Sequence, residues 1–276
     1  MTSTTMQKII TIHGLQAESL HMGLNPQQRQ RLLAVGSPLA LLCIWQLLDV
    51  LGWIDSKDFP APSTILFTMY DHLLSGALWV DIKASLYRIS LGFLFGAVPG
   101  IIIGLSVGLF PVVRRIVEPL VYSTYSIPKL AILPLLMLIF GLGETEKIIL
   151  IALGVVYPVL INTSAGVLEL DSRYLDVAKN FGASKLDYYR TVAIPGAIPM
   201  MFTGLKIGVA EALLLIVAAE MVGAQSGIGY RIWMSYEVYD MPTMFVSFLL
   251  MSALGYILSV LVDELETLIV PWKQKS

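Results

Sequence analysis

The stretch "GFLFGAVPGIIIGLSVG", residues 92 to 108, contains no charged side chain and has a glycine at every fourth position. The glycines are Gly92, Gly96, Gly100, Gly104 and Gly108. At 3.6 residues per turn, positions four apart fall on one slowly drifting face of a helix. Such a face is smooth, so the backbone of another helix can pack closely against it. The stretch therefore predicts a helix in tight contact with a neighbour, and it says nothing about chemistry.

The whole chain has the composition of a membrane protein. Of its 276 residues, 56% are hydrophobic and 14% are charged, whereas a soluble domain has about 25% charged residues. A membrane-spanning helix needs about 20 mainly apolar residues. Six stretches meet this need: 33–54, 86–110, 117–140, 147–168, 197–222 and 243–270. We expect an all-α, polytopic membrane domain over 33–272, flanked by an N-terminal tail, 1–32, and a short tail, 273–276. The N-terminal tail is polar and lacks a cleavage site, so no signal peptide is expected.

The positions of lysine and arginine predict the orientation of these spans. With a cytoplasmic N-terminus, eleven basic residues lie on the cytoplasmic side: Lys8, Arg29, Arg31, Arg114, Arg115, Arg173, Lys179, Lys185, Arg190, Lys273 and Lys275. The opposite side holds five: Lys57, Lys83, Arg88, Lys147 and Arg231. This bias and the even number of spans predict that both termini are cytoplasmic.

The third span is interrupted by Pro128 and Pro134 and carries Lys129 near its middle. Proline removes a backbone donor and disturbs a helix, and the membrane tolerates this only against protein or a water-filled cavity. A charge at this depth is by default a functional candidate. Lys129 is therefore a candidate for a translocation path, with structural pairing to a carboxylate as the alternative.

The fifth span contains Lys206, Glu211 and Glu220. Lys206 and Glu211 are five residues apart, which does not bring them together on one helix face. Each is expected to face a cavity or another helix, so both are further candidates for the path. Glu220 is a third candidate, but because it lies near the outer end of the span, simple contact with water is the preferred interpretation.

Several other classes of function are disfavoured. A net charge of −2 gives no basic surface for nucleic acid. The single cysteine, Cys43, excludes a disulfide within the chain and a cysteine-based metal cluster. The three histidines lie outside the apolar runs, and no GxxxxGK[ST] phosphate loop is present. Any ATP hydrolysis would have to come from another polypeptide.

A charged segment, "LDVAKNFGASKLDYYRTVAIP" at residues 175 to 195, separates the fourth and fifth spans. Its apolar residues recur at helical spacing on either side of Gly182, which predicts two short helices. Gly182 can take the left-handed conformation that ends a helix, and Ser184 with Asp187 resembles a capping box. The pattern predicts a cytoplasmic element whose apolar side binds something.

This segment resembles the "EAA" loop of binding-protein-dependent ABC importer permeases. The matching positions are Asp176, Val177, Ala178, Gly182, Val192, Ile194 and Pro195, with Asp176 and Val177 as mild departures. The resemblance extends from about Phe59 to Trp272. The phrases "SLYRISLGFLFG", "SIPKLAILPLLMLIFGLGETEKIILIALG", "TGLKIGVAEA" and "VAAEMVGAQSGIGY" are similar to those of the nitrate/sulfonate/taurine branch of the family.

The resemblance implies a non-catalytic permease subunit in a bacterial inner membrane. Its partners would be a second permease copy, two ABC ATPase subunits that carry ATP and Mg, and a periplasmic or lipid-anchored solute-binding protein. The chain itself would hold no cofactor. The residues implied to contact the ATPase are Asp176, Val177, Ala178, Phe181, Gly182, Leu186 and Pro195.

The family's solutes are small anions, and a sulfonate or taurine-like solute is preferred over nitrate or bicarbonate. Lys129 and Lys206 suit an anion, whereas Glu211 stands where the branch is expected to have an uncharged residue, which favours a zwitterion. A stand-alone secondary transporter or channel is the main alternative, but no internal repeat is visible. An intramembrane enzyme is a third class, for which no paired carboxylates or metal ligands are found.

Overall fold

The computed structural model describes residues 26–272, so most of the predicted N-terminal tail and the last four residues lie outside the described part. Every element within 26–272 is helical, as the sequence predicts. The helices are α2 (Pro26–Val50), α3 (Pro62–Leu74), α4 (Ala77–Leu109), α5 (Pro111–Tyr125), the 3₁₀-helix η1 (Lys129–Ile132), α6 (Leu133–Phe140), α7 (Thr145–Leu168), α8 (Ser172–Asn180), α9 (Lys185–Tyr188), the π-helical η2 (Tyr189–Ala193), α10 (Ile194–Gly223), α11 (Ile228–Glu237) and α12 (Met241–Ile269).

The chain divides into two compact units, residues 1–63 and 64–276. In the first unit, α2 is long and apolar enough to cross a membrane. It begins at Pro26, within the segment that the sequence assigns to the tail. The fold of the second unit determines where the candidate site lies.

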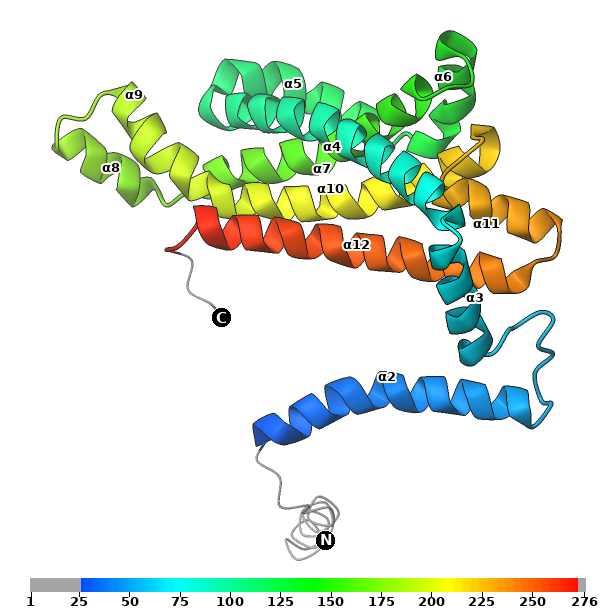
Figure 1. The fold of residues 1–276 in the computed structure, drawn as a ribbon. Helices are drawn as coiled ribbons and strands as arrows, with labels where there is room; N and C mark the ends of the chain where they lie inside the picture. The colour runs from blue at the N-terminus through cyan, green and yellow to red at the C-terminus, as the bar shows by residue number, and fades with distance from the viewer. Residues whose placement is uncertain (1–25, 273–276) are drawn as a thin grey trace, which may run out of the picture. The chain divides into compact units, whose positions relative to one another are not determined.

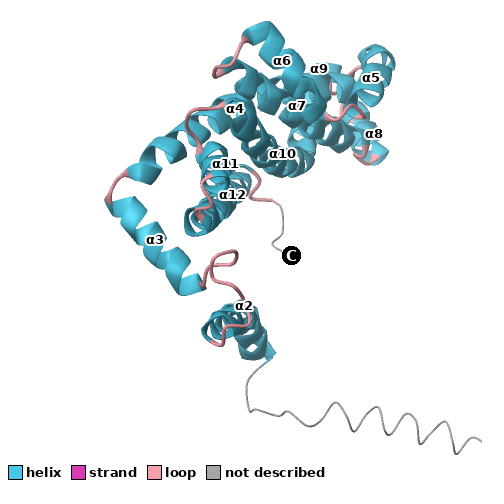
Figure 2. Cartoon of the chain, turned by 90° about the vertical axis from the view of Figure 1, so that its right-hand side faces the viewer, coloured by secondary structure: helices cyan, strands magenta, loops and turns pink. Residues whose placement is uncertain are grey.

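The centre of the second unit is α7, which packs along α4 on one side and along α10 on another. The end-on view in Figure 2 shows these three helices clustered together, and in Figure 1 α12 runs beside α10. Their shared core consists of Ile89, Ala97, Ile151, Val155, Val159, Ala212 and Ile216. A second cluster, in which Leu133 and Leu136 meet Leu150 and Leu215, attaches α6 to α7 and α10.

The glycine stripe of α4 explains why α4 and α7 approach so closely. A Cβ atom added to Gly96 would lie 2.6 Å from the carbonyl oxygen of Ala152. A Cβ atom on Gly104 would lie 2.7 Å from the carbonyl oxygen of Leu160. Real side chains do not tolerate such distances from a backbone, so only glycine fits. The predicted tight helix contact is confirmed, and its partner is the fourth predicted span.

The six predicted spans correspond to four helices that pass a length and hydropathy test and to two bent pairs that pass it together. The third predicted span is not one helix: α5 and the η1–α6 segment meet at 84°. Pro128 lies at this bend, which confirms that the span is broken. Pro134 does not break a helix, because it lies in the first turn of α6, where proline is tolerated.

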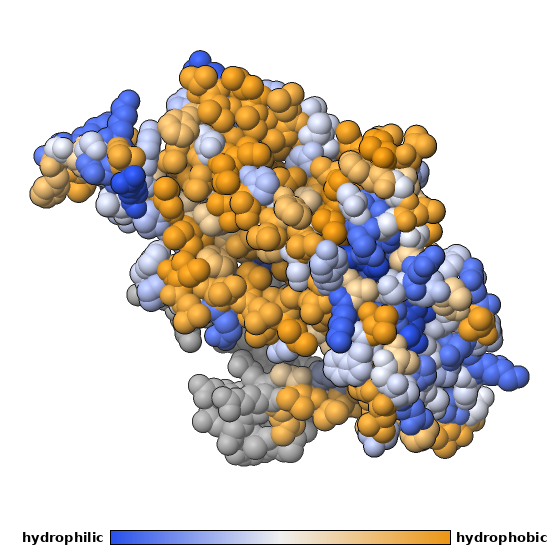
Figure 3. All heavy atoms as spheres, turned by 45° about the horizontal axis from the view of Figure 1, so that its top comes forward, coloured by the Kyte–Doolittle hydropathy of each residue, from blue (hydrophilic) through white to orange (hydrophobic). Residues whose placement is uncertain are grey.

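Hydrophobic side chains cover the upper and middle part of the face drawn in Figure 3, whereas hydrophilic residues gather at its lower right. Many large apolar residues of α4, α5, α6 and α12 are exposed, including Leu138 at 82%. Water would not stabilise such a surface, whereas the hydrocarbon of a bilayer would. The α8–α9 segment projects from the helices at the left of Figures 1 and 3 and carries mainly hydrophilic residues.

Candidate functional site

A cavity of about 300 Å³ lies at the bend between α5 and η1. It is lined by Tyr125, Ser126, Ile127, Pro128, Lys129, Gly154, Pro158 and Glu211. These residues come from the broken span, from α7 and from α10. Lys129 and Glu211 are the only charged residues in the lining. The structure thus brings together two of the four residues predicted for the path.

Lys129 is held by the end of the helix before it. The α5 helix ends at Tyr125, and Pro128 is extended, with φ −60° and ψ 116°. The Lys129 Nζ atom donates a hydrogen bond to the carbonyl oxygen of Tyr125. A cation is favoured there because the last carbonyls of a helix lack amide partners and carry partial negative charge.

Two tyrosine rings complete the environment of Lys129. Its Nζ atom lies 4.4 Å from the ring centroid of Tyr125 and 4.6 Å from that of Tyr157. The two centroids are 5.7 Å apart. A cation within about 6 Å of an aromatic face is attracted by the ring's quadrupole. Glu211 lies in the same cavity without belonging to any ion pair in the described part of the chain.

Lys206 does not reach this cavity. Its Nζ atom pairs with Asp263 at 2.5 Å and with Glu266 at 2.6 Å, both on α12. The expectation that it faces another helix is therefore confirmed. These contacts give Lys206 the role of joining α10 to α12.

Glu220 is fully buried, so the interpretation that water simply wets it is wrong. Its carboxylate accepts hydrogen bonds from Arg88 Nη1 at 2.7 Å, from Ser85 Oγ at 2.8 Å and from the amide of Gly229 at 2.8 Å. Glu220 thus joins α10 to α4 and α11, away from the cavity that contains Lys129.

The sequence assigns Arg88 to the basic residues on the outer side of the membrane, but the structure buries it, with 2% of the residue exposed. Besides Glu220 it binds Glu144, with Nε 2.5 Å and Nη2 2.7 Å from the two carboxylate oxygens. This pairing lowers the pKa of Glu144, mainly because Arg88 donates hydrogen bonds to the ionised form. The sequence offers one signal for the pair with Glu220, because Arg88 and Glu220 both lie inside predicted spans and each needs an opposite charge there.

The same end of the helices contains two further ionic contacts that the sequence did not reveal. Asp81 accepts from the amide of Gly227 at 2.8 Å and pairs with Arg231. Lys147 is 1% exposed, although it was also counted as an outer charge, and it pairs with Glu146 at 2.5 Å. A polar cavity of about 460 Å³ borders this region.

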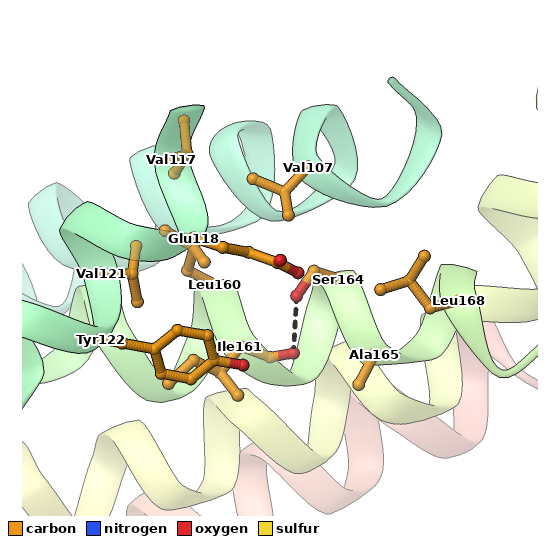
Figure 4. A pocket seen from close by; sticks show the side chains of 10 residues that line it. All are labelled: Val107, Val117, Glu118, Val121, Tyr122, Leu160, Ile161, Ser164, Ala165 and Leu168. Atoms are coloured by element: carbon orange, nitrogen blue, oxygen red, sulfur yellow. Dashed lines mark hydrogen bonds between the residues drawn. The ribbon is translucent and has the colours of Figure 1, made fainter. Parts of the chain in front are cut away.

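An additional small cavity, of about 120 Å³, lies between α4, α5 and α7. Figure 4 shows Glu118 pointing into it toward Ser164, whose hydroxyl donates to the carbonyl oxygen of Ile161. The remaining lining is apolar apart from Tyr122. Its volume and single charge make it a poorer candidate for a solute path than the cavity at the bend.

The α8–α9 segment has the predicted form of two short helices with a hinge. Gly182 adopts φ +74°, in the left-handed region that favours glycine, two residues after α8 ends. Ser184 and Asp187 form the predicted capping box. The pKa of Asp187 is lowered, chiefly because the Ser184 hydroxyl donates a hydrogen bond to its carboxylate.

This segment exposes large apolar side chains at its tip. Phe181 is 88% exposed, and Tyr174, Val177 and Leu186 are between 53% and 58% exposed. Charged neighbours keep the segment hydrophilic, and Asp176 pairs weakly with Lys179 at 3.9 Å. Pro195 lies at the start of α10 and returns the chain to the apolar helices. Exposed apolar residues on a charged projection are typical of a surface that a protein partner covers.

A bundle of apolar helices with a broken span, a charged cavity and a projecting loop defines a membrane transport subunit. Residues 98–275 match the family of binding-protein-dependent transport system inner membrane components. The chain belongs to this family and is a multi-pass inner membrane permease.

Among its relatives, the taurine transport system permease protein TauC of Escherichia coli is 31% identical over 90% of this chain and 92% of its own length. The nitrate import permease protein NrtB of Leptolyngbya laminosa is 33% identical over 72% of this chain and 71% of its own. The fold matches a chain of the MetNI methionine ABC transporter, with a TM-score of 0.58 and 21% identity over 70% of this chain and 94% of that one.

Proposed function

We propose that this permease imports a small anionic or zwitterionic solute through a path that passes the cavity between Lys129 and Glu211. The observation that carries the proposal is that these two charges line one cavity at the break in a membrane span. Irregular backbone at membrane depth is tolerated where it lines a cavity. The taurine and nitrate named for two relatives support a small, charged solute.

Transport is driven by separate ATPase subunits that bind ATP and Mg. The α8–α9 segment docks on them through the exposed apolar residues around Phe181, while Gly182 sets the angle between the two short helices. An external solute-binding protein delivers the solute to the opposite side. The permease works as a pair of identical copies, with both termini of each copy in the cytoplasm.

The path opens alternately to the two sides of the membrane. ATP draws the ATPase subunits together, the α8–α9 segments move with them, and the helices rock between inward-open and outward-open arrangements. A nucleotide shifts this equilibrium only through its different affinity for the two arrangements. The cavity needs only weak affinity, because the external protein captures the solute.

Lys129→Met tests the path. The complex of permease and ATPase, reconstituted with its binding protein, should keep its basal ATPase activity while solute uptake falls sharply. Glu211→Gln should change solute preference more than rate. Lys83→Met is the matched control, since Lys83 is an exposed lysine on α4 without an ion pair in the described chain. Uptake by Lys129→Met equal to that of Lys83→Met, or failure of the Lys129 variant to assemble, contradicts the proposal.

A further inference from the structure

We infer that the cavity at the bend selects solutes that carry an ammonium group as well as an anionic group. Tyr125 and Glu211 line this cavity, and Tyr157 lies beside it in contact with Lys129. We call these three residues the cation cage, and the ammonium of Lys129 lies within 4.6 Å of both ring centroids in this structure. This inference rests on the proposed function, because it assigns the solute class of the same cavity.

The geometry of the two tyrosines is the first support. Their rings are tilted by 47° with centroids 5.7 Å apart, and one cation lies within 4.6 Å of both centroids. Aromatic faces arranged in this way recognise ammonium ligands. The contacts of Lys129 show that the pair can hold a cation of the size of an ammonium group.

Charge balance is the second support. The lining of the cavity carries one positive and one negative side chain, so its net charge is zero. A lone anion would give the cavity a net negative charge and would be repelled by the carboxylate of Glu211. A zwitterion adds no net charge, and each of its ends finds a partner. The anionic end pairs with Lys129, and the ammonium end meets Glu211 and the rings.

Lys129 can change partners more easily than a lysine that is paired with a carboxylate. Its Nζ atom is held by one backbone carbonyl four residues earlier and by two rings, and it forms no ion pair with any residue that the structure describes. Lys206, in contrast, is bound to two carboxylates of α12. An anionic group that enters the cavity can therefore draw Lys129 away from the rings, which leaves them to the ammonium group of the same solute. A cavity of about 300 Å³ is at the lower end of the range for small-molecule sites.

Taurine and isethionate provide a matched pair of probes, since they differ only by an ammonium group in place of a hydroxyl. The permease should be purified with its ATPase partner in lipid nanodiscs, without an external binding protein, so that only the membrane cavity can discriminate. Ligand binding raises the unfolding temperature in a concentration-dependent way. The quantity compared is the probe concentration that gives half of the maximal rise in unfolding temperature. We expect this concentration to be roughly tenfold higher for isethionate than for taurine, which corresponds to the loss of one charged hydrogen bond.

Variants of the cage residues test whether the cation cage causes the preference for taurine over isethionate. Glu211→Gln and Tyr157→Leu should bring the two half-maximal concentrations together, whereas Tyr157→Phe should keep them apart, because phenylalanine retains the aromatic face. Tyr122→Leu is the control, since Tyr122 lines a different cavity. If Tyr157 had a merely structural role, its replacement would weaken the binding of taurine and of isethionate alike and would leave the ratio of the two half-maximal concentrations unchanged.

The inference is overturned if the two probes have equal half-maximal concentrations. It is also overturned if neither probe stabilises the complex. A preference for taurine that survives both Glu211→Gln and Tyr157→Leu overturns it as well. None of these results overturns the proposed path, which is judged separately by the uptake of the Lys129→Met complex. If uptake by Lys129→Met equals that of Lys83→Met while the wild-type complex still prefers taurine, the proposed function alone is overturned.

Discussion

Arg88, Lys129 and Lys206 are cations on apolar helices, and the structure satisfies each in a different way. Arg88 is buried between two carboxylates that come from other elements. The side chain of Lys206 is 36% exposed and pairs with two carboxylates of a neighbouring helix. Lys129 alone among the three relies on a carbonyl and aromatic rings. The residue that lines the cavity is therefore the one that is free to change partners.

The buried pair between Arg88 and Glu220 should be important for stability. Removing one partner of a buried ion pair costs about 3–5 kcal/mol, because the other charge is left without compensation. Arg88→Met should therefore lower the unfolding temperature of the detergent-solubilised permease clearly. The double variant Arg88→Met/Glu220→Met should be more stable than the single one, since it also removes the buried carboxylate that the single variant leaves without its arginine. A double variant no more stable than Arg88→Met would contradict this explanation.

At the scale of elements, the contact between α4 and α7 depends on the absence of side chains. A Cβ atom on Gly100 would lie 2.9 Å from the Cβ atom of Val159. Gly100→Leu should therefore separate the two helices and destabilise the permease by about 1–3 kcal/mol, as other overpacked cores do. Thermal unfolding in detergent measures the effect. Gly36→Leu is the control, because a Cβ atom added there would meet no other described part of the chain within 4 Å, and equal stability of the two variants would refute the packing role.

The hinge of the α8–α9 segment gives a second prediction at this scale. A β-branched residue is strained at the positive φ of Gly182, so Gly182→Val should re-aim the two short helices. The variant should insert in the membrane normally but lose most solute-stimulated ATPase activity. Ala183→Val, one residue later and also exposed, should retain it. Normal coupling in the Gly182 variant would show that the hinge angle is unimportant.

The sequence predicted the helices, the break at Pro128 and the hinge at Gly182 because each follows from local rules of hydropathy, proline and glycine geometry. It also named Lys129 and Glu211, since a charge in an apolar run is visible without a structure. It could not reveal which carboxylates lie beside Lys206 or which donors surround Glu220. Those partners are far away in the chain, and they become neighbours only through the packing of α4, α10 and α12.

At the scale of the whole molecule, the proposed orientation can be tested by labelling. The single native cysteine allows Cys43→Ser to serve as a background without thiols. In that background, Ser75→Cys should react with a membrane-impermeant thiol reagent added to intact cells. Ser184→Cys in the α8–α9 segment should react only after the cells are permeabilised. The reverse pattern would place the segment outside and exclude its docking on cytoplasmic ATPase subunits.

The tight seam of glycines has a mechanical consequence. Since a Cβ atom at any of the five glycines would clash with α7, we expect α4 and α7 to resist sliding and to move together. The 24 residues of α7 give this helix a length of about 36 Å. The α8–α9 segment lies between α7 and α10 in the chain, so a movement of the segment would act on both helices. If a partner moves the α8–α9 segment, we therefore expect α4 and α7 to follow as one body.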